Sequence, residues 1–99
     1  MPSDESLTDG ASVCRTVTIV NQRGLHARAA AKFVKLAGQF TAQVFVSKRG
    51  TEVSGLSIMG LMMLAAGPGC SIDLKANGAD AEQAIIALAQ LVEGKFGED

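Results

Sequence analysis

His26, the only histidine of the chain, lies in residues 24–28, whose sequence is Gly-Leu-His-Ala-Arg. A neutral imidazole nitrogen is a nucleophile near neutral pH, and it is also a good leaving group. The guanidinium of Arg28 is a rigid, charged donor that suits phosphoryl oxygens. Together these two side chains have the chemistry needed to accept and release a phosphoryl group. The alternative interpretation is that His26 is a capping or surface residue without chemistry.

The pattern around His26 predicts that a strand ends before it and a helix begins beside it. Apolar residues alternate with threonines over residues 16–19, the period-two pattern of a half-buried strand. After His26, apolar residues recur at helical spacing and end before Gly38, a residue type that commonly follows a helix. His26 is therefore expected at or beside the helix N-cap. Unpaired backbone N–H groups and the positive end of the helix dipole favour an anion there.

A second segment, residues 53–64, has the sequence Val-Ser-Gly-Leu-Ser-Ile-Met-Gly-Leu-Met-Met-Leu. Ser57 is expected to cap a short helix over residues 57–66, which the Gly-Pro-Gly sequence of residues 67–69 ends. Three residues are sufficient for the buried side of so short a helix: Leu61, Leu64 and Ala65. The methionines beside them are typical either of a core or of an adaptable binding surface.

With these two motifs in this order, the chain resembles the HPr family, the histidine phosphocarriers of the bacterial phosphoenolpyruvate-dependent phosphotransferase system. The resemblance runs from about residue 15 to residue 98, and the separation of His26 from Ser57 matches that between the family's active histidine and regulatory serine. It implies that Nδ1 of His26 accepts a phosphoryl group, that Arg28 contacts that group, and that Ser57 is a regulatory phosphorylation site. It also implies a surface that docks partners, made of Ile58, Met59 and Met62 and framed by Lys32 and Lys35.

The resemblance also implies partners and a mode of action. An HPr-like chain would receive the phosphoryl group from enzyme I and pass it to enzyme IIA domains, with HPr kinase/phosphorylase as a further partner. It would act as a monomeric relay and not as an enzyme, and it would need no metal or cofactor.

Two positions depart from the family pattern: Ala29 stands where proline is usual, and Leu56 stands where lysine is common. Ala29 is compatible with the nitrogen-related branch of the family. The alternative function is a regulatory module, in which phosphorylation of His26 or Ser57 controls partner binding instead of sugar uptake.

Composition argues against several other classes of protein. The 99 residues carry a net charge of −1, and all 4 aromatic residues are Phe. Both facts disfavour a nucleic-acid-binding domain, which needs a basic surface and stacking rings.

The longest apolar-rich run, residues 58–66, is too short to cross a membrane. The N-terminus lacks a signal-peptide pattern, and the 2 cysteines lack metal-ligand spacing. We therefore expect a cytoplasmic protein with free thiols.

The remaining periodicities complete the predicted fold. Strands are expected over residues 13–20, 42–47, 51–54 and 72–76, and a last helix begins at Asp80, with Gln83 completing a capping-box-like pair. The order βαββαβα predicts an α+β fold. The resemblance implies an HPr-like open-faced β-sandwich, a four-stranded antiparallel sheet with three helices on one face. Residues 1–12 are expected to be a disordered extension, and residues 13–99 to form the HPr-like phosphocarrier domain.

Overall fold

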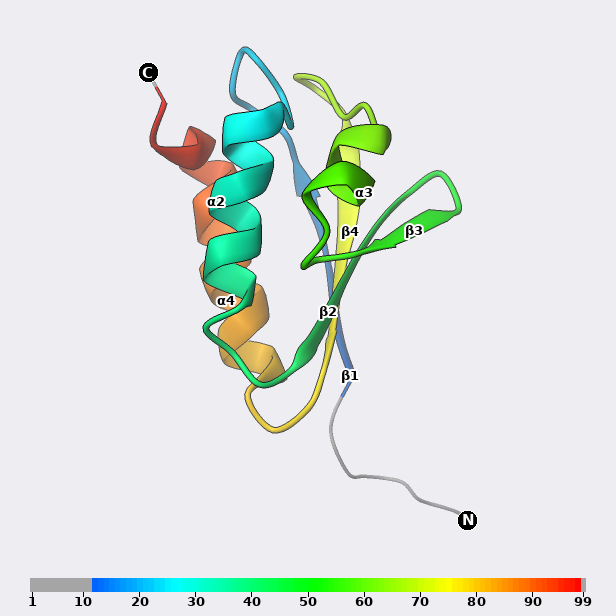
Figure 1. The fold of residues 1–99 in the computed structure, drawn as a ribbon, viewed down its shortest axis with the longest axis vertical. Coiled ribbons are helices and arrows are strands. Elements are labelled where there is room, and N and C mark those ends of the chain that lie inside the picture. Colours follow the sequence, from blue (N-terminus) through cyan, green and yellow to red (C-terminus); the bar gives the residue numbers. More distant parts are fainter. Residues whose placement is uncertain (1–11, 99) are drawn as a thin grey trace.

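A computed structural model of the chain describes residues 12–98 and contains one sheet covered by helices (Figure 1). Its elements are β1 (Ser12–Thr18), α2 (Ala27–Ala37), β2 (Gln43–Lys48), β3 (Thr51–Ser54), α3 (Ile58–Met63), β4 (Ser71–Asn77), α4 (Ala81–Glu93) and the 3₁₀ helix η1 (Lys95–Gly97). The predicted order βαββαβα is confirmed. The predicted extension over residues 1–12 lies outside the described residues except for Ser12, which already belongs to β1.

The four strands form one antiparallel sheet in the order β1-β4-β2-β3. The register pairs Val17 with Ile72 and Val46 with Leu74, so apolar partners share one face of the sheet. A two-residue turn, Arg49-Gly50, joins β2 to β3, and both residues have positive φ (52° and 84°). These angles are what a type I′ hairpin turn requires.

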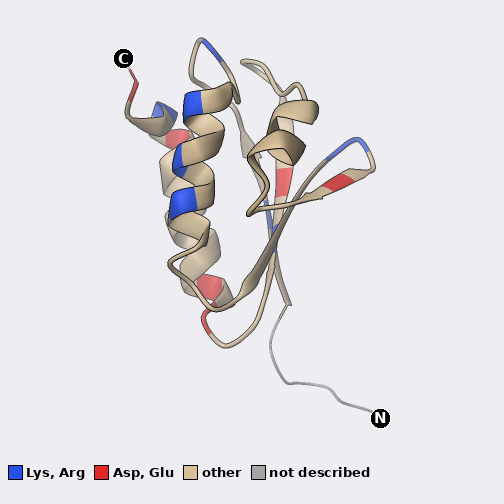
Figure 2. Cartoon of the chain, in the orientation of Figure 1, with Lys and Arg blue, Asp and Glu red and all other residues tan. Residues whose placement is uncertain are grey.

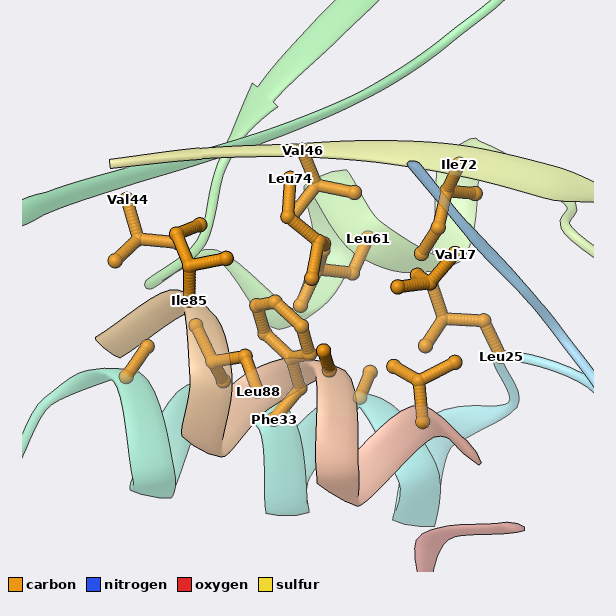
Figure 3. Close-up of a cluster of buried hydrophobic side chains, with 14 of the residues drawn as sticks. Val17, Leu25, Phe33, Val44, Val46, Leu61, Ile72, Leu74, Ile85 and Leu88 are labelled. Carbon is orange, nitrogen blue, oxygen red and sulfur yellow. The ribbon is translucent and has the colours of Figure 1, made fainter. Parts of the chain in front are cut away.

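All three α-helices lie on the face of the sheet that carries these apolar pairs, as Figure 1 shows. The close-up in Figure 3 shows Phe33 of α2 and Leu88 of α4 directed toward Val46 and Leu74 of the strands. All four side chains are fully buried, and burial of this apolar surface is the main force that holds the helices on the sheet. The predicted open-faced β-sandwich is thereby confirmed.

The opposite face of the sheet is polar and is left uncovered by helices. The Thr16 hydroxyl donates to Asp73 at 2.6 Å, and the Lys75 ammonium lies 3.5 Å from a Glu52 oxygen. The alternation of apolar and polar residues along each strand therefore separates a buried face from a hydrated one.

Asp80 has a different role from the one that the sequence suggested. It is the N-cap residue of α4, but its carboxylate makes no hydrogen bond to that helix, so the predicted capping-box-like pair with Gln83 is wrong. The two carboxylate oxygens accept from the backbone N–H groups of Thr41 and Ala42, at 2.9 and 2.8 Å. The Thr41 hydrogen bond is the largest effect on the carboxyl, and it lowers the pKa of Asp80. Asp80 therefore fastens the α2–β2 connection to the start of α4.

Two elements are shorter than the sequence predicted. β1 ends at Thr18 instead of residue 20, and α3 ends at Met63 instead of residue 66. Ala65 follows α3 with a φ of 52° and is exposed, while Ala66 is buried in the place that was expected for Ala65.

Candidate functional site

His26 is the N-cap residue of α2, as the sequence predicted, and its backbone is extended, with φ −79° and ψ 179°. Its carbonyl accepts the first helical hydrogen bond, from the Ala30 N–H at 2.8 Å. The backbone N–H groups that come before Ala30 in the first turn of α2 have no acceptor within the helix, and they form the positive end of its dipole. The His26 side chain is 17% exposed and makes no capping hydrogen bond to α2. The ring is therefore reachable and stands at a place that favours an anion.

The turn before His26 is held against the segment that follows α3. The Leu25 N–H donates to the Ala66 carbonyl at 2.9 Å. Gly24 has a φ of +66°, and a Cβ atom at this position would lie 2.5 Å from the Ala66 carbonyl oxygen, so only glycine fits. This close approach joins the His26 turn to the segment that follows α3, although Leu25 and Ala66 lie 41 positions apart in the sequence.

Glu98 contacts the His26 ring, a contact that the sequence did not predict. The distance between Nε2 of His26 and Oε2 of Glu98 is 2.5 Å, and the other carboxylate oxygen accepts from the Asn21 amide at 3.1 Å. The hydrogen bond with His26, followed by the one from Asn21, lowers the pKa of Glu98. Nδ1 of His26 makes no hydrogen bond to any described residue. Glu98 therefore contacts one ring nitrogen, and the other ring nitrogen is without a hydrogen bond among the described residues.

Basic side chains follow one another along α2, and the helix contains no acidic residue (Figure 2). They are Arg28, Lys32 and Lys35, and all three residues are exposed. Arg28 lies in the first turn, two residues after His26. The Lys32 ammonium donates to the Phe96 carbonyl at 2.7 Å, so this residue, which was expected to frame a docking surface, also holds the C-terminal turn.

Ser57 is the N-cap residue of α3, as predicted. Its hydroxyl oxygen accepts from the Gly60 N–H at 2.9 Å. The opposite end of α3 is also held, because the Lys48 ammonium donates to the Leu64 and Ala65 carbonyls, both at 3.1 Å. A cation at a helix C-terminus satisfies carbonyls that would otherwise lack a donor. These contacts fix a helix that spans only residues Ile58–Met63.

Large apolar side chains on and before α3 point into solvent and form what we call the α3 patch. Its members are Leu56, Ile58, Met59, Met62 and Met63, and their exposed fractions run from 39% to 77%. Ile58, Met59 and Met62 were expected to be exposed, which is confirmed, whereas the exposure of Leu56 and Met63 was not expected. Leu61 and Leu64 face the core instead. An exposed apolar group of this size is typical of a protein–protein contact surface.

Two further features bear on the class of protein. Among residues 12–98, no three His, Cys, Asp or Glu side chains are grouped so as to hold a metal ion. Within the same residues, each helix is too short or too polar to span a bilayer.

Comparisons with known proteins identify the family of the chain. Residues 13–94 match the family described as "PTS HPr component phosphorylation site". The phosphocarrier protein HPr of Cupriavidus necator is 50% identical over 84 residues, which cover 85% of this chain and 94% of that protein. The phosphocarrier protein NPr of Shewanella violacea is 44% identical over 84 residues, covering 85% and 92%.

A solved structure is similar as well. The crystal structure of an HPr from Thermoanaerobacter tengcongensis superposes with a TM-score of 0.84 at 46% identity, covering 88% of this chain and 98% of that one. The family match extends over most of the chain, and the helices and sheet are arranged as in an HPr structure. The chain therefore belongs to the HPr/NPr family of phosphocarrier proteins of the phosphotransferase system.

Proposed function

We propose that the chain carries a phosphoryl group on Nδ1 of His26, accepting it from phosphorylated enzyme I and donating it to enzyme IIA domains. The observation that carries this proposal is the placing of His26. The ring lies at the N-terminus of α2, and Nε2 is hydrogen-bonded to the Glu98 carboxylate. Nδ1 is then the nitrogen that can act as the nucleophile. Backbone N–H groups of the first helical turn and the Arg28 guanidinium are suited to bind the phosphoryl oxygens.

The surroundings of His26 support recognition by large partners. The α3 patch offers apolar contact area, and the flexible methionines in it suit a surface that must fit more than one protein. Helix α2, which carries the basic residues, contacts α3, and its positive charges complement acidic partner groups. We infer that enzyme I and enzyme IIA dock on this combined surface and that Lys32 and Lys35 frame it. The chain is then a relay and not an enzyme. The partner protein supplies the other charged groups that stabilise the phosphoryl group during transfer.

Ser57 supports a second, regulatory role for the same surface. Its hydroxyl lies between Leu56 and Ile58 of the α3 patch, where a phosphate would place about two negative charges in the docking area. We infer that HPr kinase/phosphorylase is the modifying partner and that phosphorylation weakens docking. The same arrangement serves the alternative function, in which phosphorylation of His26 or Ser57 controls regulatory binding instead of sugar uptake.

We place this relay in the cytoplasm as a monomer. Cys14 and Cys70 are both free thiols among the described residues, which agrees with a reducing compartment.

The test is transfer from phosphoenolpyruvate in the presence of enzyme I and Mg²⁺, read by intact mass. The parent protein is expected to gain about 80 Da, the mass of one phosphoryl group, in an acid-labile and base-stable form. His26→Ala is expected to gain nothing while keeping its fold, because the ring makes no capping bond to α2. Ser57→Ala is the control and should gain the same mass as the parent. Undiminished labelling of His26→Ala would refute the proposal.

A further inference from the structure

The C-terminal turn holds Glu98 against His26 in a conformation that surrounding contacts must enforce. Lys95, Phe96 and Gly97 have consecutive positive φ values of 61°, 54° and 77°. Residues with side chains rarely adopt this region, so it persists only where neighbouring contacts determine it. Two contacts do so. The Phe96 side chain is fully buried, and the Lys32 ammonium donates to the Phe96 carbonyl at 2.7 Å.

Both oxygens of the Glu98 carboxylate have a defined partner. Oε1 accepts from Nδ2 of Asn21 at 3.1 Å, and Oε2 lies 2.5 Å from Nε2 of His26. The same Asn21 amide donates to the Gly24 carbonyl at 2.8 Å, and Asn21 is buried. One side chain therefore ties the turn before His26 to the carboxylate that contacts the ring.

We propose that Glu98 is a positioning residue for phosphoryl transfer, one that fixes the proton of His26 on Nε2 and leaves the Nδ1 lone pair as the nucleophile. An ionised carboxylate can only accept a hydrogen bond, so the nitrogen it contacts must carry the proton. The carboxylate thus selects one of the two imidazole tautomers, as carboxylates do for histidines that ligate metals or act as bases. The kinetic part of this inference rests on the proposed function, whereas the tautomer itself does not.

With this assignment, the Nε2 proton stays in place through both phosphoryl transfers. The Nδ1 lone pair forms a bond to phosphorus while the bond from phosphorus to the donor breaks, and that electron pair leaves with the donor. The Nε2 proton stays on the ring, which now carries a positive charge beside the Glu98 carboxylate. When the next acceptor attacks phosphorus, the N–P electron pair returns to Nδ1 and the neutral ring with its Nε2 proton is regenerated.

The tautomer can be measured without any phosphoryl transfer. Because the chain has a single histidine, its two ring nitrogens give one unambiguous pair of ¹⁵N signals in long-range ¹H–¹⁵N spectra. At about pH 8.5, where an ordinary imidazole is neutral, the parent should show a protonated Nε2 and an unprotonated Nδ1. Glu98→Ala should move both signals toward the average of the two tautomers. Glu93→Ala removes a carboxylate that pairs with Arg15 at the end of α4, and this control should leave both signals unchanged.

Kinetics supply the second measurement. With enzyme I as the donor, Glu98→Ala should lower the rate constant of transfer by about 10-fold or more, the usual effect of losing a residue that orients a reactive imidazole. KM should change little, because Glu98 contacts the ring and lies outside the α3 patch. Glu98→Gln retains a carbonyl oxygen that can accept from Nε2, so both its spectrum and its rate should fall between those of the parent and Glu98→Ala.

The two measurements separate this inference from the proposed function. If the parent already shows averaged tautomers, or if Glu98→Ala keeps the parent spectrum, Glu98 does not position the ring. If the spectra behave as expected but the parent accepts no phosphoryl group, the proposed function fails and the positioning of the ring stands. If Glu98→Ala does not fold, Glu98→Gln decides, and parental signals together with a parental rate in that variant would count against a role for the charged carboxylate.

Discussion

Ser57 combines a structural and a docking role, and two substitutions are expected to separate them. Ser57→Ala removes the oxygen that accepts from the Gly60 N–H at 2.9 Å. Loss of such an N-cap costs about 1 kcal/mol, which lowers the melting temperature of a domain of this size by about 4–8 °C. Ser57→Asp keeps an acceptor at the same position and adds a negative charge at the positive end of α3, so its melting temperature should stay within about 3 °C of the parent.

For docking, Ser57→Asp is expected to be the more damaging of the two substitutions, although Ser57→Ala is the more damaging one for stability. In Ser57→Asp the carboxylate lies among exposed apolar side chains, where a partner would have to desolvate it and place its own acidic groups nearby. We expect the KM for phosphorylation by enzyme I to rise at least about fivefold, equivalent to about 1 kcal/mol of docking free energy, while Ser57→Ala keeps the parental KM.

Melting curves and initial rates of phosphorylation, measured on the same preparations, test both expectations. Ser12→Asp is the matched control, because it adds the same charge at the exposed start of β1, and Figure 1 shows that β1 starts at the opposite end of the domain from the start of α2, which His26 caps. A parental KM for Ser57→Asp would show that partners do not dock over Ser57. A parental melting temperature for Ser57→Ala would show that the cap contributes nothing to stability.

The remaining predictions concern Arg28 and Asp80. Arg28→Ala should slow transfer to His26 by roughly 10–100-fold, because a charged hydrogen-bond donor contributes about 1.5–3 kcal/mol, and stopped-flow phosphorylation by enzyme I with a parental rate would show that Arg28 is only a surface residue. Asp80 has a pKa below the ordinary value of 3.8, since its carboxylate accepts from the Thr41 N–H, so its contribution to stability is present above about pH 3.8 and is lost as the pH falls through the lowered folded-state pKa. Urea unfolding should accordingly show Asp80→Asn less stable than the parent near neutral pH, with the difference shrinking toward about pH 2; a difference that is independent of pH would contradict this account.

Much of the fold and half of the candidate site could be predicted from local pattern. The placing of His26 and Ser57 at helix N-caps depends on nearby residues alone, because the period of the apolar residues changes next to each of them. For Met59 the local pattern left both a buried and an exposed position open, and the family resemblance implied exposure; Leu61 and Leu64 in fact supply the buried side of so short a helix. Asp80 shows the limit of this reasoning. Its sequence context offers a cap, yet the carboxylate binds Thr41 and Ala42, which lie 38 or more residues away in the chain.

The C-terminal half of the site has no comparable local signal. Lys95 and Phe96 adopt left-handed backbone conformations that neither residue favours, and the sequence of η1 gives no indication of a turn that reaches back to His26. That turn exists because the Phe96 ring is buried and because Lys32, a residue of α2, satisfies its carbonyl. Glu98 therefore reaches the ring only through contacts between segments that lie far apart in the sequence, such as the hydrogen bonds from Lys32 to Phe96 and from Asn21 to Glu98. A sequence motif can identify the nucleophile, because the nucleophile belongs to one helix start, whereas the group that orients it depends on tertiary packing and becomes visible only in the folded structure.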